Sequence, residues 1–185
     1  MRWEQLFADL EAAFAAEQAA AEDLASRTRA EVGAVRLADR LRGSTGRDVA
    51  LDCAGAGRVA GRLVDVGSDW VLLAAERGQE LLVATGCLRA VGGLGPVTAP
   101  ADEPGVVARS WDLRRAVRGL ARDRAAVRCV LQDGTVLTGT VDRVGADFLE
   151  LAEHHLDQPR RRTAVTSVRA VVLGAVALLA SPGAG

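Results

Sequence analysis

The chain has 185 residues, of which 49% are hydrophobic and 25% charged, with a net charge of -1. This composition suffices for one domain or two small ones with a hydrophobic core, and it excludes wholesale disorder and a generally basic nucleic-acid-binding surface. The longest nearly unbroken apolar run, residues 170–180, is about half as long as a membrane-spanning helix, and the first residues lack a secretory apolar stretch. We therefore expect a cytoplasmic protein with no membrane partner.

Residues 1–46 are predicted to form a helical segment, because residues 2–42 hold twelve alanines and no proline. The first 25 residues carry six acids and one arginine, whereas residues 26–42 carry five arginines and two acids. Antiparallel self-pairing as a coiled coil would join these opposite charges. An apolar stripe at helical spacing is the predicted surface for a protein partner or a second copy. The stripe consists of Trp3, Leu6, Phe7, Leu10 and Phe14.

An internal repeat follows. Residues 49–73 match residues 127–151 without a gap, each residue meeting the one 78 positions later. In both copies the apolar residues alternate with polar ones, which indicates half-buried strands. Asp133-Gly134 is typical of a tight hairpin, and we expect a type I′ turn there. Gly61 and Gly139 fall inside strands, where they indicate a sharp bend or a close backbone approach.

Downstream of the gapless match, two alignments of the copies compete. Residues 88–91 can be set on residues 168–171, or residues 83–91 on residues 171–179. The first keeps three identities in four and needs only two extra residues in the second copy, so it is preferred. It leaves residues 175–185 as an apolar C-terminal tail.

The segment between the copies, residues 93–108, contains three prolines and several glycines and is predicted to be a linker. Residues 113–121 have the apolar spacing of an amphipathic helix with Ser110 or Asp112 as its N-cap. The predicted fold is therefore α+β: a long N-terminal helix and two five-stranded small barrels, each preceded by a helix. The first barrel spans residues 47–92, and the basic helix with the second barrel spans residues 109–174.

The second copy carries Val127-x-Cys129-x-Leu131-x-Asp133-Gly134-x-x-Leu137-x-Gly139-x-Val141, followed by Ala164-Val165-x-Ser167-Val168. These segments resemble the two motifs of the Sm-like family that includes Hfq. The resemblance covers about 60 residues of this copy and, more weakly, the same length of the first. It implies a helix capping a strongly bent five-stranded sheet of the SH3-like kind, in a family that typically forms rings and binds RNA.

The chain departs from the family where RNA is bound. Hfq-like proteins place Tyr-Lys-His before the second-motif alanine, where this chain has Arg161-Arg162-Thr163, and the first copy has Leu81-Leu82-Val83. Eukaryotic Sm proteins use an asparagine near the third strand, and this chain has no asparagine. The known uridine pocket is therefore missing, and the resemblance implies a fold more strongly than an activity.

Candidate chemistry is sparse. Cys53, Cys87 and Cys129 are far apart in apolar surroundings, which favours buried, inert thiols over a disulfide framework or a zinc site. His154-His155 lies among acidic residues, but adjacent strand residues point to opposite faces, so we expect no metal. No serine has the context of a nucleophile. We expect no enzyme, no cofactor and no small-molecule substrate.

The leading hypothesis is a non-enzymatic adaptor or regulatory protein that binds a partner, or itself, through the N-terminal helix. The alternative is a regulator that binds RNA or DNA through an arginine-rich helix and loop. A third hypothesis is recognition of a peptide that adds a strand to an open sheet edge. The arginines of the alternative are Arg114, Arg115, Arg118, Arg122, Arg160, Arg161 and Arg162. All 23 basic residues are arginine, which fits a GC-rich bacterial coding sequence, so arginine abundance alone is not evidence for nucleic-acid binding.

Overall fold

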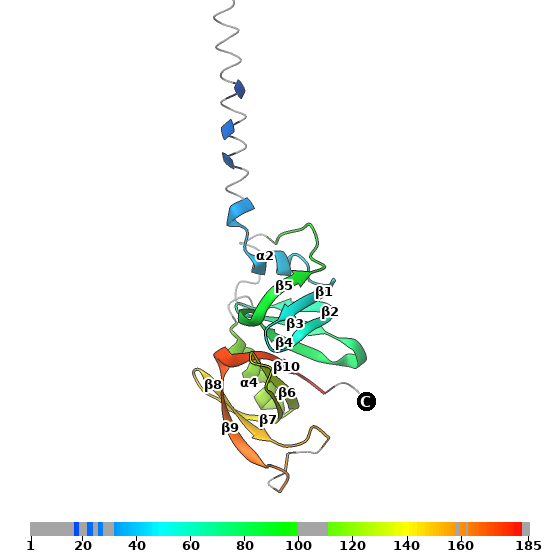
Figure 1. Ribbon diagram of the computed structural model, residues 1–185, viewed down its shortest axis with the longest axis vertical. Coiled ribbons are helices and arrows are strands. Elements are labelled where there is room, and N and C mark those ends of the chain that lie inside the picture. The colour runs from blue at the N-terminus through cyan, green and yellow to red at the C-terminus, as the bar shows by residue number, and fades with distance from the viewer. Residues whose placement is uncertain are drawn as a thin grey trace, which may run out of the picture. The chain divides into compact units, whose positions relative to one another are not determined.

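The computed structural model describes residues 17–18, 22–23, 26–27, 32–99, 111–157, 160–161 and 163–182. The chain divides into two compact units, residues 1–37 and residues 38–185. The second unit is built on antiparallel strands (Figure 1). The strands are β1 (Asp48–Cys53), β2 (Gly57–Val66), β3 (Trp70–Ala74), β4 (Glu80–Ala84), β5 (Leu88–Gly92), β6 (Ala126–Leu131), β7 (Val136–Val144), β8 (Phe148–Glu153), β9 (Ser167–Val172) and β10 (Val176–Ala180). The helices are α2 (Leu37–Arg42) and α4 (Leu113–Asp123), with 3₁₀ turns η1 (Glu76–Gly78), η2 (Thr85–Cys87) and η3 (Leu173–Ala175).

All ten strands form one open antiparallel sheet in the order β5-β1-β2-β3-β4-β10-β6-β7-β8-β9. The prediction of two closed small barrels is therefore wrong. The physical reason lies at β4, which pairs with β10 of the other repeat instead of closing onto β5. That pairing joins the two halves into one continuous sheet, and it leaves β5 and β9 at its ends. Figure 1 shows β10 between the strands of the two repeats.

The sequence repeat is present in the strand pairing. Val49 lies opposite Gly61 in the first copy, and Val127 lies opposite Gly139 in the second, in the same register. Strands β2 and β7 each carry a register shift at the same repeat position. The first and fifth strands of each copy also pair with one irregularity at the equivalent place. The two halves therefore have the same strand pairing, with β-bulges at equivalent positions.

The C-terminal segment is a strand and not a tail. Strand β10 follows η3 as β5 follows η2, and residues 176–180 are all buried. The structure thus aligns residues 83–91 with residues 171–179, so the preference for the other alignment was wrong. β10 is the fifth strand of the second repeat, and it also pairs with the fourth strand of the first.

The two mid-strand glycines allow a close backbone approach, as predicted. A Cβ atom at Gly61 would lie 2.5 Å from the carbonyl oxygen of Ala74, and one at Gly139 would lie 2.0 Å from that of Ala152. Carbon and oxygen cannot approach so closely without displacement of the backbone. The bend of each half of the sheet around its core thus requires glycine at this position, because any larger side chain would meet the neighbouring backbone.

The Asp133-Gly134 hairpin forms with a different turn from the one expected. The backbone N–H of Leu131 donates to the carbonyl of Thr135 at 2.9 Å, which encloses three loop residues. Gly134 has a φ of 89°, whereas Asp133 is not among the described residues with positive φ. A type I′ turn needs positive φ at both central residues, so this is the three-residue hairpin with a glycine bulge.

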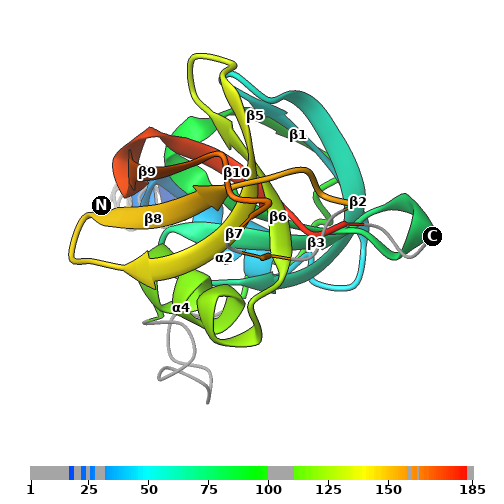
Figure 2. The same ribbon diagram turned by 90° about the horizontal axis from the view of Figure 1, so that it is seen from below.

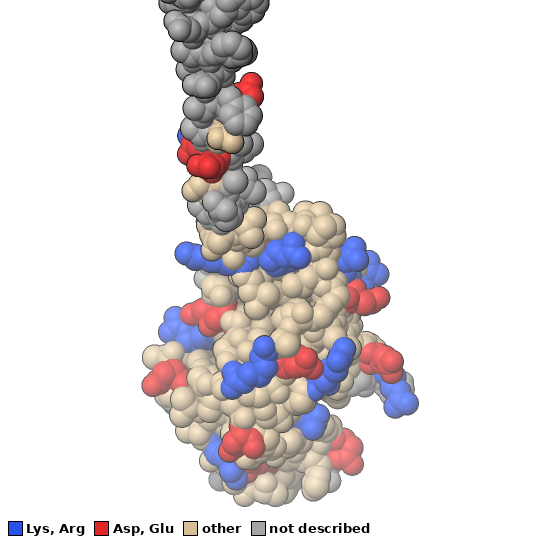
Figure 3. All heavy atoms as spheres, turned by 45° about the horizontal axis from the view of Figure 1, so that its top comes forward, with Lys and Arg blue, Asp and Glu red and all other residues tan. Residues whose placement is uncertain are grey.

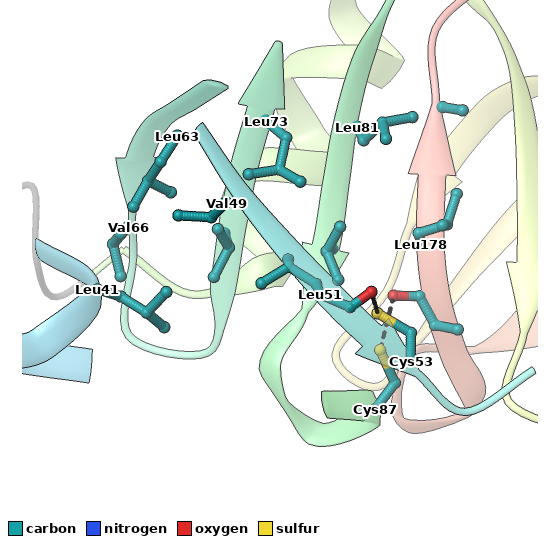
Figure 4. Close-up of a cluster of buried hydrophobic side chains, with 14 of the residues drawn as sticks. Leu41, Val49, Leu51, Cys53, Leu63, Val66, Leu73, Leu81, Cys87 and Leu178 are labelled. Atoms are coloured by element: carbon teal, nitrogen blue, oxygen red, sulfur yellow. Dashed lines mark hydrogen bonds between the residues drawn. The ribbon is translucent and has the colours of Figure 1, made fainter. Parts of the chain in front are cut away.

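Each repeat has its own hydrophobic cluster. In the first cluster Leu41 of α2 packs with side chains from β1, β2 and β3 (Figure 4). In the second, Leu113 and Val117 of α4 pack with side chains of β6, β7 and β8. Figure 2 shows α4 beside the strands of this second repeat. Strands β4 and β10 contribute to both clusters, because their successive side chains point to opposite faces.

The described residues do not form a continuous N-terminal helix or a coiled coil, so these predictions are wrong. Helix is present at residues 17–18, 22–23, 26–27 and 32–34, and it is interrupted at Val35 and Arg36 before the six-residue α2. The interruption follows Gly33, and glycine and β-branched residues have low helix propensity. Within this unit Arg27 pairs with Asp23 at 2.7 Å, one helical turn away, with both side chains exposed.

Part of the predicted linker packs against α2. The side chain of Arg40 donates to the carbonyl of Pro96 at 3.0 Å, and the backbone N–H of Ala99 donates to the carbonyl of Asp39 at 3.1 Å. The buried hydroxyl of Ser44 accepts from the N–H of Gly95 at 3.0 Å. Residues 93–99 are therefore held in place, while residues 100–108 of the linker lie outside the described residues.

Candidate interaction edges

The predicted partner-binding stripe lies outside the described residues, so its role stays a prediction. It comprises Trp3, Leu6, Phe7, Leu10 and Phe14. The residues of the nucleic-acid hypothesis are almost all described, and they lie on α4 and in the connection between β8 and β9.

The arginines of α4 lie on a well-capped helix, and two of them have local partners. Asp112 caps the helix by accepting from the backbone N–H of Arg115 at 2.8 Å. The guanidinium of Arg115 stacks 4.2 Å above the ring of Trp111, and Arg114 lies 3.7 Å from the carboxylate of Asp112. The remaining two helix arginines of the hypothesis, Arg118 and Arg122, are exposed.

The loop arginines belong to the connection between β8 and β9 and not to α4. Arg160 forms an ion pair with Asp142 of β7, and Arg161 is exposed. Arg162 lies outside the described residues. On the face drawn in Figure 3, basic and acidic side chains are mixed.

A hollow of about 520 Å³ lies where the two repeats meet. Its charged lining consists of Asp69, Asp112, Asp147 and Arg114. Three carboxylates and one guanidinium give this hollow an acidic character, which is unfavourable for phosphate groups. Asp69 and Asp147 occupy equivalent positions in the two repeats, and both line this hollow.

The side chain of His154 is buried and hydrogen-bonded within the protein. Its ring is buried, with Nε2 2.8 Å from the hydroxyl of Thr140 and Nδ1 2.8 Å from the carbonyl oxygen of His155. Because the carbonyl can only accept, Nδ1 carries a hydrogen and donates it, while Nε2 is bonded to the hydroxyl of Thr140. Both nitrogens are then engaged within the protein. Within the described parts of the chain, no group of three or more histidine, cysteine or acidic side chains is arranged to hold a metal ion.

The three cysteines are buried and free. Desolvation raises the pKa of Cys129 to about 12. The pKa of Cys53 is raised by a hydrogen bond with Cys87 and by burial. The Cys87 thiol also donates to the carbonyl of Ala177 in β10 at 3.4 Å, as drawn in Figure 4.

The sheet ends in two strands with an unpartnered side. Among the residues that the structure describes, β5 pairs only with β1, and β9 pairs only with β8. The sequence hypothesis of strand addition to an open edge named no strand, and the structure supplies two. An unpartnered edge presents backbone donors and acceptors that another strand can pair with.

The junction between β4 and β10 shows how such edges pair. Leu178 lies opposite Val83, and Ala180 lies opposite Leu81. One residue further, the backbone N–H of Ser181 donates to the carbonyl of Glu80 at 2.9 Å. This junction therefore joins the fourth strand of the first copy to the fifth strand of the second copy.

The free edges are the repeat equivalents of the two strands in that junction. β9 is the fourth strand of the second copy, and β5 is the fifth strand of the first. Leu82 in β4 is buried, but its equivalent Ala170 in β9 is exposed. Likewise Leu178 in β10 is buried and its equivalent Ala90 in β5 is exposed. The difference arises because the described chain has no further strand beside β9 or β5.

Two large apolar side chains are exposed on β9. Val168 and Val172 are each 60% exposed, whereas Ala84, the equivalent of Val172, is 7% exposed at the junction. Arg169 lies between them and pairs with Glu153 at 3.1 Å. A charged residue in an edge strand is a common feature that limits uncontrolled pairing.

No protein-family model matches the chain, and no curated protein matches it. No described helix has the length and apolar character needed to cross a membrane.

Proposed function

We propose that this protein is a non-enzymatic interaction protein, an adaptor or regulatory subunit, which binds protein by strand addition at β5 and β9. The observation that carries the proposal is that each of these strands has one side without a partner strand among the described residues. The same side of their repeat equivalents, β10 and β4, is paired and buried. The edges thus have the backbone geometry that pairs elsewhere in the same molecule. The N-terminal stripe stays a second predicted contact of the same protein.

The backbone of the edges supports the proposal. In antiparallel pairs, residues alternate between hydrogen-bonded and non-hydrogen-bonded positions. Because Ser181 and Glu80 are hydrogen-bonded, Leu179 and Leu82, two places further along, are hydrogen-bonded as well. Ala170 is the equivalent of Leu82, so its N–H points toward the open side of β9. By the same equivalence, Val91 of β5 directs its N–H toward the open side of β5.

Other observations favour binding over catalysis. The ring nitrogens of His154 are both occupied, and the three thiols are buried. Nucleophilic and acid-base catalysis need accessible groups placed together. The nucleic-acid alternative has less support, because Arg114, Arg115 and Arg160 have local partners and the hollow at the junction is acidic.

The Sm-like resemblance stays part of the proposal at the level of the repeat unit. Each copy has a preceding helix and five antiparallel strands in the order fifth-first-second-third-fourth. That arrangement agrees with a helix leading a bent five-stranded sheet, although the sheet here is open and shared by both copies. Shared architecture supports a binding module more than any particular ligand.

The proposal is tested with strand peptides and the full chain. A peptide copying residues 175–182 should pair with β9, because β10 pairs with β4 in the chain. Hydrogen exchange should then slow at the Ala170 amide, and Ala170→Pro should weaken binding about tenfold because proline removes one ladder donor. A matched control, Ala170→Val, keeps the N–H and should bind as the unmodified chain does. Unchanged exchange at Ala170 and at Val91, with peptides copying β10 and β4 respectively, would overturn the proposal.

A further inference from the structure

We propose that Cys53 and Cys87 form a reversible disulfide bond when the protein is oxidised, so that the first repeat carries a redox-sensitive cross-link between β1 and η2. This modification site is independent of strand addition at β5 and β9. Both cysteines are free in the structure, and both belong to the hydrophobic cluster of the first repeat. Cys129 lies in the cluster of the second repeat, so it is not a member of the pair.

The backbone brings the two cysteines together. Cys53 ends β1 and lies opposite Leu88 of β5, the residue directly after Cys87. The backbone N–H of Ala54 donates to the carbonyl of Cys87 at 2.8 Å. The two thiols are hydrogen-bonded to each other, and Figure 4 shows both sulfur atoms beside β10. A disulfide needs neighbouring backbone segments and side chains that point toward each other, and this pair has both.

The second repeat has the same backbone arrangement without the thiols. Leu131 takes the place of Cys53 at the end of β6. Ala175 takes the place of Cys87 in η3, and its carbonyl accepts from the N–H of Gln132 at 2.9 Å. Leucine and alanine therefore fill this place in the fold, so packing alone does not require two sulfur atoms in the first repeat.

Oxidation of the pair also affects the junction between the repeats. The thiol of Cys87 donates to the carbonyl of Ala177 at 3.4 Å. Ala177 is fully buried and lies at the register shift of β10, where it has no opposite residue in the described strands β4 and β6. A disulfide has no S–H group, so this carbonyl loses its thiol donor when the bond forms. The cross-link thus changes the environment of the strand that joins the two repeats.

The reaction takes two electrons and two protons from the thiol pair. With hydrogen peroxide as the oxidant, one sulfur gains a hydroxyl group as the O–O bond breaks, and a water leaves. The second sulfur then displaces that hydroxyl, which leaves as a second water. The hydrogen bond from Cys53 lowers the pKa of Cys87, which favours the thiolate that starts the reaction. Gly86 beside Cys87 is exposed, so a small oxidant reaches the pair by local opening.

The disulfide is tested in the folded full-length chain with overnight exposure to millimolar diamide, which accepts the same two electrons and two protons. Free thiols counted afterwards in urea should fall from three to one, and a reductant should restore all three. A tryptic digest should contain the Cys53–Cys87 disulfide, with Cys129 free. A chain oxidised in urea should instead give all three pairs, with Cys53–Cys87 about half of the total because the shortest loop closes most readily.

Two variants check which thiols react. Cys87→Ala, which copies Ala175 of the second repeat, should keep both remaining thiols after diamide, and Cys129→Val should lose both of its thiols. The oxidised unmodified chain should unfold at a urea concentration about 1 M higher, because the bond restricts the unfolded chain more than the loss of one weak S–H hydrogen bond destabilises the fold. Three free thiols after exposure, a mixture of pairs like that formed in urea, or a midpoint that does not rise would overturn the proposed cross-link.

Discussion

The carboxylate of Asp69, in the loop between β2 and β3, accepts a 2.6 Å hydrogen bond from the backbone N–H of Leu113 at the start of α4. The first repeat thereby satisfies a helix donor of the second, since the first N–H groups of a helix have no partner within it. The first residue of β3 makes a second contact, because the indole N–H of Trp70 donates to the carbonyl of Trp111 at 2.9 Å. The helix of the second repeat is therefore held by both halves of the sheet.

Asp69→Ala is expected to lower the free energy of unfolding by about 1 kcal/mol, as for the loss of a helix cap. Asp147→Ala is the matched control, because Asp147 has the same place in the second repeat. Both aspartates accept from a 3₁₀ backbone N–H through their main-chain carbonyls, Asp69 from Thr85 and Asp147 from Leu173. Urea unfolding at low protein concentration measures both, and the control should change by less than about 0.5 kcal/mol. Equal effects would contradict the role of the Asp69 side chain.

The mid-strand glycines give a second prediction. Gly61→Ala and Gly139→Ala should each destabilise the fold by about 3 kcal/mol, since the new methyl would lie 2.5 Å or less from a carbonyl oxygen. Gly119→Ala is the control: Gly119 lies within α4, and a Cβ there meets nothing within 4 Å. This change should stabilise the protein by about 0.5–1 kcal/mol. Thermal unfolding of the three variants gives the comparison, and similar midpoints for all would refute it.

The local features of the fold could be predicted from the sequence because their signals are local. Alternation of apolar residues predicted the strands, and Gly61 and Gly139 predicted the close approach. The 78-residue repeat predicted that Val49 and Val127 have equivalent places, and both are buried opposite a glycine. Each of these inferences depends on residues within one repeat.

Features that depend on contacts between the repeats could not be predicted. Strand β10 is buried on both faces, so it has no alternation by which to recognise a strand. The sequence therefore predicts a tail at these residues. The alignment of the repeats that makes β10 equivalent to β5 is not the one that the sequence favours. Unless residues 176–180 are recognised as a strand, the sequence predicts neither the junction of β10 with β4 nor the two free edges. In strand β9 an apolar residue type does not indicate burial, because Val168 and Val172 are apolar and yet exposed.

The N-terminal stripe gives a third prediction. Removal of residues 1–25 deletes Trp3, Leu6, Phe7, Leu10 and Phe14 and should lower the oligomeric mass of the protein in solution, since an apolar stripe of this size is rarely left in water. The sheet should keep its stability, because its core lies within residues 38–185. Light scattering and urea unfolding of the truncated and full-length chains measure the two effects. An unchanged mass would argue against the stripe as a contact surface.

The buried thiols predict how stability changes in alkaline solution. The pKa of Cys129 is raised by burial to about 12 in the folded chain, from an ordinary value of 9.0. Above pH 9 the unfolded chain therefore releases this proton first, so folding stability is complete below that pH and declines toward pH 12. The slope is about 1.4 kcal/mol per pH unit for one thiol. The chain has no lysine and no tyrosine, so side-chain titration in this range belongs to the cysteines.

Cys129→Val is expected to remove the contribution of this thiol, because valine does not titrate. The raised pKa of Cys53 leaves a smaller slope in the variant. Urea unfolding midpoints measured at several values between pH 8 and pH 11 should diverge, with the unmodified chain losing stability faster. A thiol reagent at pH 8 should react with the folded protein far more slowly than with the unfolded one, since Cys129 is fully buried. Parallel pH profiles for the two chains would show that the Cys129 thiol does not titrate differently in the folded and unfolded states.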